Sequence, residues 1–272
     1  MGDLVPGDDG DPVEEVGSWA TTKHEYLRRY IDISRGVRQR FVGPRNAGAT
    51  YIDLFSGPGR AKVRNGDFID GSCVAAWKMS CRGGAPFTEV IIADADADRL
   101  ELAEQRLRKL GAPVKVYFGK AADTAKTIAS RLNPYGLHFA FIDPFNLGAF
   151  DFEVIKAFAG LQRIDMVVHV SKMDLQRNLG FNVKAQQDAF EVFAPGWRNV
   201  VNLSQPQSSI RRGVFDHWRN LVANAGVAPS ADMKLITGSK GQHLYWLLLA
   251  AKHELAHKFW KVASDDGQGS LF

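Results

Sequence analysis

Short apolar runs alternate with helix-length segments over the first two thirds of the chain. The apolar runs have the length of buried strands, and they lie at 50–55, 89–94, 114–118, 138–142 and 165–170. Between and after them, helices are expected at 73–80, 97–110, 121–132 and 150–161. Repeated strand-helix-strand units predict a parallel sheet with helices on both faces. The pattern therefore predicts a doubly wound α/β fold.

An added helix precedes the first strand. Tyr26, Leu27, Tyr30 and Ile33 recur at helical spacing, and Thr22 to Glu25 fits a capping box, so the helix is expected to begin near Thr22. Residues 1–17, with Gly-Asp-Asp-Gly-Asp-Pro at their centre, are predicted to be a disordered acidic tail.

Beyond residue 171 the alternation weakens. An insertion near 171–230 is expected to hold helices near 184–193 and 210–225. Met233–Ile236 and Leu244–Leu249 flank a glycine-containing loop, which predicts an antiparallel pair at the edge of the sheet. A closing helix at 252–263 and a flexible tail at 265–272 follow. Residues 18–264 are thus predicted to form one domain.

Composition agrees with one ordinary globular domain. The 272 residues are 45% hydrophobic and 24% charged, which is enough to bury a core. The longest wholly apolar run, Leu244–Ala251, is far shorter than the roughly 20 residues of a membrane span. Cys73 and Cys81 have no partner at metal-ligand spacing, and both are interpreted as reduced core thiols. A cytoplasmic protein without a metal site or a membrane contact is expected.

Charge is unevenly distributed near the amino end. Residues 1–18 carry acids and no Lys or Arg, whereas the predicted first helix and its exit are basic. Arg28, Arg29, Arg35 and Arg38 are candidate contacts to a nucleic acid backbone. A solvated helix face is the alternative interpretation.

A two-glycine turn follows the first strand in Tyr51-Ile-Asp-Leu-Phe-Ser-Gly-Pro-Gly-Arg60. Such a turn lets backbone amides approach a ligand at the carboxyl end of a strand. Lys62 stands where the dinucleotide fingerprint needs a third glycine, which disfavours a nicotinamide site. The Asp-x-x-x-Gly-x-Gly spacing instead resembles the first motif of S-adenosylmethionine (SAM)-dependent methyltransferases. The candidate cofactor-binding residues of this turn are Asp53, Phe55, Ser56, Gly57 and Gly59.

Further acids follow the next two strands. Asp94, with Ala95 and Asp96 behind it, stands where a carboxylate would accept the ribose hydroxyls. Asp123 could receive an adenine amino group, although a helix amino terminus also favours an acid for its dipole alone.

Asp143-Pro144-Phe145 ends the fourth strand and is the candidate catalytic motif. The carboxylate and the Pro144 carbonyl could accept hydrogen bonds from a substrate amine, with Phe145 as a stacking face. The motif looks like the Asp-Pro-Pro-aromatic signature of amino methyltransferases, but it has one proline fewer. After the fifth strand, any of Lys172, Asp174 or Arg177 could face the substrate, although a solvated loop is the simpler interpretation of each.

Together these motifs resemble the three-Cys-motif partner protein family, a bacterial and phage group with a methyltransferase-like fold. The resemblance runs from Trp19-x-x-x-Lys23, through the glycine turn, Gly71-Ser72 and Phe141–Phe145, to Arg177-Asn178 and the segment 245–253. It implies a Rossmann-like methyltransferase sheet of seven mostly parallel strands with an antiparallel last strand. It also implies a partner that carries a three-cysteine motif and resembles radical SAM enzymes.

Three functions remain open at this point. The first is a SAM-dependent methyltransferase acting on nucleic acid or a modified nucleoside. The second is a non-catalytic partner subunit that keeps the fold, and the third is a nucleic-acid-binding protein without chemistry.

Overall fold

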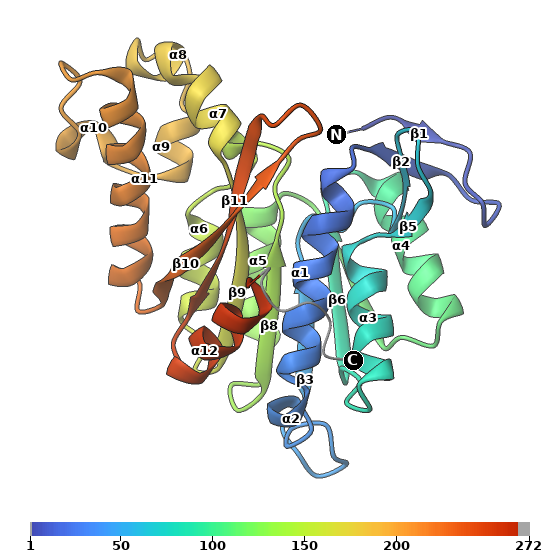
Figure 1. Cartoon of the computed structure of the whole chain (residues 1–272). Helices are drawn as coiled ribbons and strands as arrows, with labels where there is room; N and C mark the ends of the chain where they lie inside the picture. Colours follow the sequence, from blue (N-terminus) through green and yellow to red (C-terminus); the bar gives the residue numbers. More distant parts are fainter. Residues whose placement is uncertain (1, 266–272) are drawn as a thin grey trace.

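A seven-stranded sheet forms the centre of the computed structural model, which describes residues 2–265 (Figure 1). Its spatial order is β10-β11-β9-β8-β3-β6-β7. The strands are β3 (Ala49–Asp53), β6 (Glu89–Asp94), β7 (Val114–Phe118), β8 (Leu137–Ile142), β9 (Ile164–Ser171), β10 (Ala228–Thr237) and β11 (His243–Ala251).

Only β11 runs against its neighbours in this sheet. It pairs antiparallel with both β9 and β10, while the pairs among β7, β6, β3, β8 and β9 are parallel. The predicted fold class is therefore confirmed, including the antiparallel last strand. Because parallel strands end at the same edge, the carboxyl ends of β3, β6 and β8 meet there.

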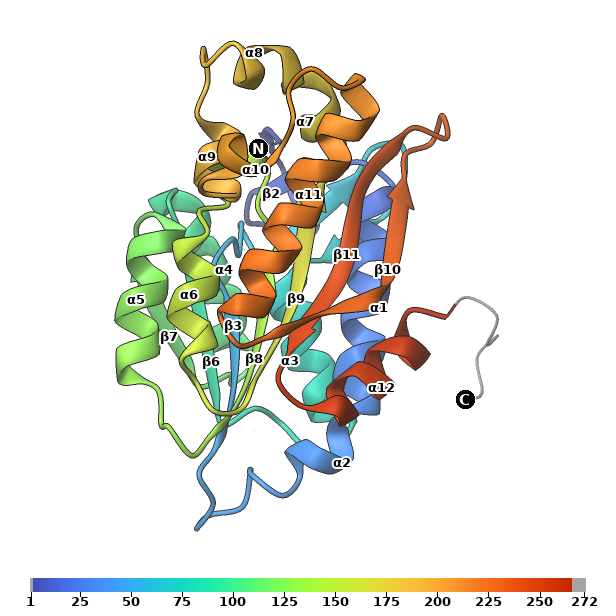
Figure 2. The ribbon, with the colours of Figure 1, turned by 90° about the vertical axis from the view of Figure 1, so that its left-hand side faces the viewer.

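Helices cover both faces of the sheet (Figure 2). One face carries α1 (Trp19–Ile33), α3 (Ser72–Arg82), α4 (Ala97–Lys109) and α12 (Glu254–Ala263). The other carries α5 (Ala121–Arg131), α6 (Glu153–Ala159) and α11 (Gln207–Asn224). Successive strand residues point to opposite faces, so Ile52 joins one core cluster and Tyr51 the other.

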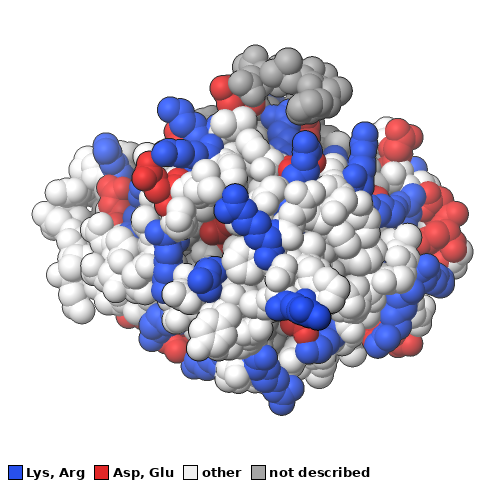
Figure 3. Space-filling view, turned by 90° about the horizontal axis from the view of Figure 1, so that it is seen from below, with Lys and Arg blue, Asp and Glu red and all other residues white. Residues whose placement is uncertain are grey.

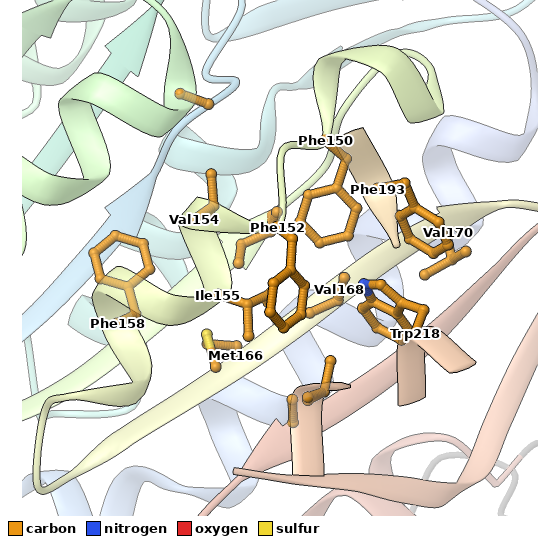
Figure 4. Packing of buried hydrophobic residues seen from close by; sticks show 14 of the residues in the cluster. Phe150, Phe152, Val154, Ile155, Phe158, Met166, Val168, Val170, Phe193 and Trp218 are labelled. Atoms are coloured by element: carbon orange, nitrogen blue, oxygen red, sulfur yellow. The ribbon is translucent and has the colours of Figure 1, made fainter. Parts of the chain in front are cut away.

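The insertion after β9 is more helical than predicted. It contains α7 (Lys172–Arg177), α8 (Leu179–Val183), α9 (Ala189–Phe193), α10 (Trp197–Val200) and α11. Its aromatic side chains join the core under the sheet, where Phe193 stacks on Trp218 with ring centroids 5.1 Å apart and Phe150 lies against both (Figure 4). A short 3-10 helix, η1 (Leu147–Ala149), connects β8 to α6.

The amino-terminal segment is ordered from Gly2 on, which corrects the predicted disordered tail for residues 2–17. Residues 2–16, here called the N-terminal strap, contain β1 (Leu4–Val5) and β2 (Val13–Val16). A small second sheet of order β1-β2-β4-β5 joins them to the hairpin β4 (Arg60–Val63) and β5 (Phe68–Asp70). The 60–70 segment therefore forms an antiparallel hairpin beside the strap. Of the predicted tail at 265–272, all but Asp265 lies outside the described residues.

Ion pairs explain why the acidic strap is held. Its acids pair with bases of β4, α4 and the β4–β5 turn, as Asp8–Arg60, Asp9–Arg106, Asp11–Lys109, Glu14–Arg99 and Glu15–Arg64. The composition of residues 1–17 alone predicted a solvated acidic tail, because the basic residues that pair with these acids follow more than 40 residues later in the sequence.

Two smaller expectations also need correction. Helix α1 begins at Trp19, ahead of the predicted capping box, so Thr22 lies inside the helix. Cys73 is buried as predicted, but Cys81 is exposed on α3.

Helix α2 (Arg35–Arg38) follows α1 directly. Within residues 2–265, no helix combines the length and the apolar character needed to cross a membrane.

Candidate functional site

A cavity of about 900 Å³ opens at the carboxyl ends of the parallel strands, and residues of the N-terminal strap and of α7 line it. Its wall includes the glycine turn, the ends of β6, β8 and β9, the start of α5 and residues 14–17 of the strap side. This size is at the upper end of ordinary ligand pockets. The cavity is therefore large enough for two small molecules side by side or for one large ligand.

Gly57 brings backbone directly to the cavity. Its φ of 54° lies in the left-handed region, and its Cα faces Glu14, whose Oε2 would be 3.5 Å from an added Cβ. Gly59 has a φ of 77° and does not line the cavity; an added Cβ would lie 3.2 Å from the Cα of Ala103. Gly57 thus forms part of the cavity wall, whereas Gly59 allows the turn to pack closely against α4.

Asp53 lies beneath the turn and not in the cavity wall. It is 0% exposed, and its carboxylate accepts hydrogen bonds from Ser72 Oγ (2.6 Å), Tyr51 OH (3.0 Å) and the Phe55 amide (3.2 Å). Burial raises the pKa of Asp53 to about 6, against the lowering effect of these hydrogen bonds. Phe55 lines the cavity, while Ser56 is buried away from it. The predicted direct contact between Asp53 and a cofactor is therefore not available in this structure.

Asp94 is the acid that does face the cavity on the β6 side, together with Ala95. Its two carboxylate oxygens accept the Gly57 and Asp96 amides, each at 2.9 Å, and burial raises its pKa. Asp96 caps α4 by accepting the Asp98 and Arg99 amides and does not line the cavity. Of these two neighbouring acids, Asp94 therefore faces the cavity and Asp96 begins the helix.

Asp123 is exposed in the first turn of α5 and does not line the cavity. The residues that do so are those just before it, Lys120, Ala121 and Ala122. The sequence analysis chose Asp123 because of its charge. In the structure the N-cap residue of α5 and its first two residues line the cavity instead.

Asp143, Pro144 and Phe145 all line the cavity on the β8 side. The Phe145 side chain is 56% exposed, so its ring is available to a ligand. Asp143 Oδ2 pairs with Lys23 of α1, and Oδ1 contacts His169 Nδ1 at 2.8 Å. Both oxygens therefore already have partners. Burial alone would raise the pKa of Asp143, but Lys23 and the His169 hydrogen bond outweigh burial and hold it well below its usual range.

Sequence reasoning did not assign a role to Lys23, His169 or Tyr245, which share this wall. The His169 and Tyr245 ring centroids lie 3.9 Å apart, and His169 Nε2 and the Tyr245 hydroxyl have no hydrogen-bond partner among the described residues. A polar residue late in the apolar strand β9 was the available signal for His169. The pairing of Ile142 with Val168 places Asp143 and His169 at equivalent positions on neighbouring strands.

Of the three candidates after β9, Arg177 lines the cavity. Lys172 does not; its Nζ lies 2.8 Å from His243 Nδ1 and 5.0 Å from the Trp246 ring centroid. Asp174 accepts the Leu147 amide at 3.0 Å and so fixes η1. Among residues 2–265, no three His, Cys, Asp or Glu side chains are grouped as metal ligands would be.

The arginines predicted to bind nucleic acid do not form one surface at the cavity. They lie in the second half of α1 and in α2, toward the opposite end of the sheet (Figure 1). Seen from below, basic side chains are scattered among acidic and uncharged ones (Figure 3). Arg38 is only 2% exposed and donates to the carbonyls of Ala85 and Ile31. Arg29 pairs with Glu25 and Arg35 with Asp32. Arg38 is therefore a structural residue of the core and is not exposed for the predicted contact with a nucleic acid backbone.

No family model matches the chain, and no curated protein matches its sequence. Solved structures do show similarity. An O-methyltransferase from Bacillus cereus in complex with SAH is 15% identical with a TM-score of 0.45, covering 85% of this chain and 81% of its own. The O-methyltransferase TomG from Streptomyces achromogenes in complex with SAM is 16% identical with a TM-score of 0.48, covering 85% and 80%. A putative RNA methyltransferase from Pyrococcus horikoshii is 10% identical with a TM-score of 0.42, covering 83% and 81%. These neighbours are methyltransferases, and the likeness to them is one of fold.

Proposed function

We propose that this chain is a SAM-dependent methyltransferase. The observation that carries the proposal is one cavity whose wall holds Gly57 and Asp94 on one side and Asp143-Pro144-Phe145 on the other. A cofactor that binds a glycine turn and a strand-end carboxylate would thus lie beside a second group of polar and aromatic residues suited to an acceptor.

The residues present fit such a cofactor. Asp94 would accept the ribose hydroxyls, and Gly57 gives the close backbone approach. Ala95, Ala121 and Ala122 complete the wall with small side chains. Asp53 and Asp96 support this site from within by fixing the turn and the start of α4. When bound, SAM supplies a methyl group on a positively charged sulfur, so the protein has mainly to position the acceptor.

For the acceptor we propose a nucleic acid or a modified nucleoside. The exposed Phe145 ring is a platform on which a base can stack, and such stacking is worth about 1–3 kcal/mol. Arg177 and Lys120 add cations to the cavity wall, and neither has an ion-pair partner within residues 2–265. The Pro144 carbonyl accepts no hydrogen bond within residues 2–265, so it is a further acceptor of this motif for a substrate donor.

Calorimetric titration with S-adenosylhomocysteine is the first test. We expect the full chain to bind it, and we expect Asp94→Asn to bind it more weakly; a parent protein that does not bind it at millimolar concentration contradicts the proposal. Label transfer from methyl-tritiated SAM to total RNA and to DNA then tests the acceptor class.

A non-catalytic partner subunit of a three-cysteine-motif protein is the second candidate. Large apolar side chains are exposed on the insertion, at Phe181, Val200 and Leu203. Where such side chains form one contiguous patch, they are typical of a surface that another protein covers. Binding of S-adenosylhomocysteine without label transfer to RNA, DNA or protein would favour this candidate over the enzyme.

A further inference from the structure

Three titratable side chains from distant parts of the chain meet in the cavity wall. Lys23 comes from α1, Asp143 follows β8 and His169 belongs to β9. Their side chains are only 10–13% exposed. Asp143 lies between the other two, with one carboxylate oxygen toward each.

The position of the histidine proton follows from this arrangement. Asp143 is ionised, because the charge of Lys23 and the His169 hydrogen bond hold its pKa low against burial. An ionised carboxylate can only accept, so Nδ1 of His169 must be the donor of the 2.8 Å hydrogen bond. Neutral His169 therefore carries its proton on Nδ1 and a lone pair on Nε2.

Nothing within residues 2–265 uses that lone pair. Nε2 is buried and has no hydrogen-bond partner, although His169 lines the cavity. Leaving a buried acceptor unpaired costs about 1–3 kcal/mol, which a donor on a ligand bound against His169 would recover.

We propose that His169 Nε2 is the base that takes a proton from the methyl acceptor, and that Asp143 and Lys23 are its positioning residues. This inference rests on the proposed methyltransferase function. It restricts the acceptor to a group that still carries a proton when it is methylated, namely a hydroxyl, an amine or a ring N–H. An acceptor atom without a proton to lose, such as a thioether sulfur, has no need of this base.

The proposed step transfers a proton from the acceptor to His169 and a methyl group to the acceptor. The O–H or N–H bond of the acceptor breaks, its electron pair remains available to the acceptor atom, and the proton moves to Nε2. The acceptor atom forms its bond to the methyl carbon as the carbon–sulfur bond breaks, and that electron pair stays on sulfur. The imidazolium that results is stabilised by the ionised Asp143.

The surroundings keep His169 ready for this role near neutral pH. Burial is the main cause that lowers its pKa, and Lys23 of α1 lowers it further; Asp143 and, more weakly, Asp174 of α7 raise it. Tyr245 of β11 packs on the ring with its hydroxyl unpaired. Because the net effect is a pKa below the usual value, His169 is neutral at pH 7 and can accept a proton.

Nitrogen-15 NMR of the histidine rings in the full chain tests the inference without an acceptor. His169→Gln assigns the signals, with His217→Gln on α11 as a control. At pH 7.5 we expect a protonated Nδ1 and a bare Nε2, and Lys23→Met is expected to raise the pKa of His169 because it removes a neighbouring positive charge. A proton on Nε2 at pH 7.5, or a pKa unchanged by Lys23→Met, would overturn the proposal.

Transfer of tritiated methyl to whichever nucleic acid the parent labels gives the second readout. His169→Gln should bind S-adenosylhomocysteine as the parent does, yet lose about 10²–10⁴-fold in rate and lose the acid limb of the pH profile. Unchanged rate and pH profile in this variant would refute the base role while leaving the methyltransferase proposal intact. Failure of the parent to bind S-adenosylhomocysteine would instead refute the proposed function, and the NMR result would still decide the protonation state.

Discussion

Replacing Asp53 tests whether this acid supports the glycine turn or contacts a cofactor. Asparagine can accept the Phe55 amide through its oxygen and donate to the hydroxyls of Tyr51 and Ser72, which can rotate. Alanine leaves all three groups without their partner. Each buried group left unsatisfied costs about 1–3 kcal/mol, so Asp53→Asn should be more stable than Asp53→Ala by at least about 3 kcal/mol.

The charge of Asp53 makes a second, pH-dependent contribution. Its pKa is about 6 in the folded protein against 3.8 ordinarily, so the folded state binds the proton more tightly than the unfolded state. The stabilisation is fully present below about pH 4 and is lost as the pH rises through 6. The difference of about 2 units corresponds to about 3 kcal/mol. Asp53→Asn, which lacks this loss, should therefore gain about 3 kcal/mol relative to the parent between pH 4 and pH 7.

Urea unfolding at pH 4, 5, 6 and 7 measures these free energies, and calorimetry with S-adenosylhomocysteine measures the cofactor site. We expect Asp53→Asn to keep the parent affinity within about threefold, or roughly 0.7 kcal/mol. A variant as stable as the parent at every pH, with binding abolished, would refute the reasoning. That result would mean that the carboxylate meets the cofactor directly and is not the buried support of the turn.

Three further predictions follow from contacts of the same region. Asp94→Asn should weaken S-adenosylhomocysteine binding about tenfold, or about 1.4 kcal/mol, by calorimetry, because it removes the charge that faces the cavity; unchanged affinity would contradict this. Gly59→Ala should cost more stability than Gly84→Ala in urea unfolding, because both have positive φ and pay about 1–2 kcal/mol, but only Gly59 would crowd another residue; equal losses would argue against that contact. Raising ionic strength from about 0.05 to 0.5 M should speed amide hydrogen exchange in residues 13–16 but not in β8, because salt screens the five ion pairs of the N-terminal strap; insensitivity to salt would show that they contribute little.

The strands of the sheet were predictable because a buried parallel strand is a nearly continuous apolar run. The segments 89–94 and 114–118 coincide with β6 and β7. The same logic located Asp94 and Asp143, since ligands of such sheets lie beyond the carboxyl ends of the strands.

The errors arose where long-range contacts decide the outcome. The acidic strap is ordered by cations on α4 and β4, and Arg38 is buried because α2 packs its guanidinium against the carbonyl of Ala85. Lys23 reaches Asp143 only because α1 crosses the same edge of the sheet. No local pattern contains these partners, so a run of charge was interpreted as solvated when it was in fact paired.

The placement of Gly2 has a practical consequence. Its amide donates to Glu14, its carbonyl accepts from Arg99, and the residue itself forms part of the cavity wall. Whatever is fused ahead of it must emerge at the wall of the cavity. An affinity handle placed there would therefore compete with ligands of the cavity, and its removal before binding measurements is advisable.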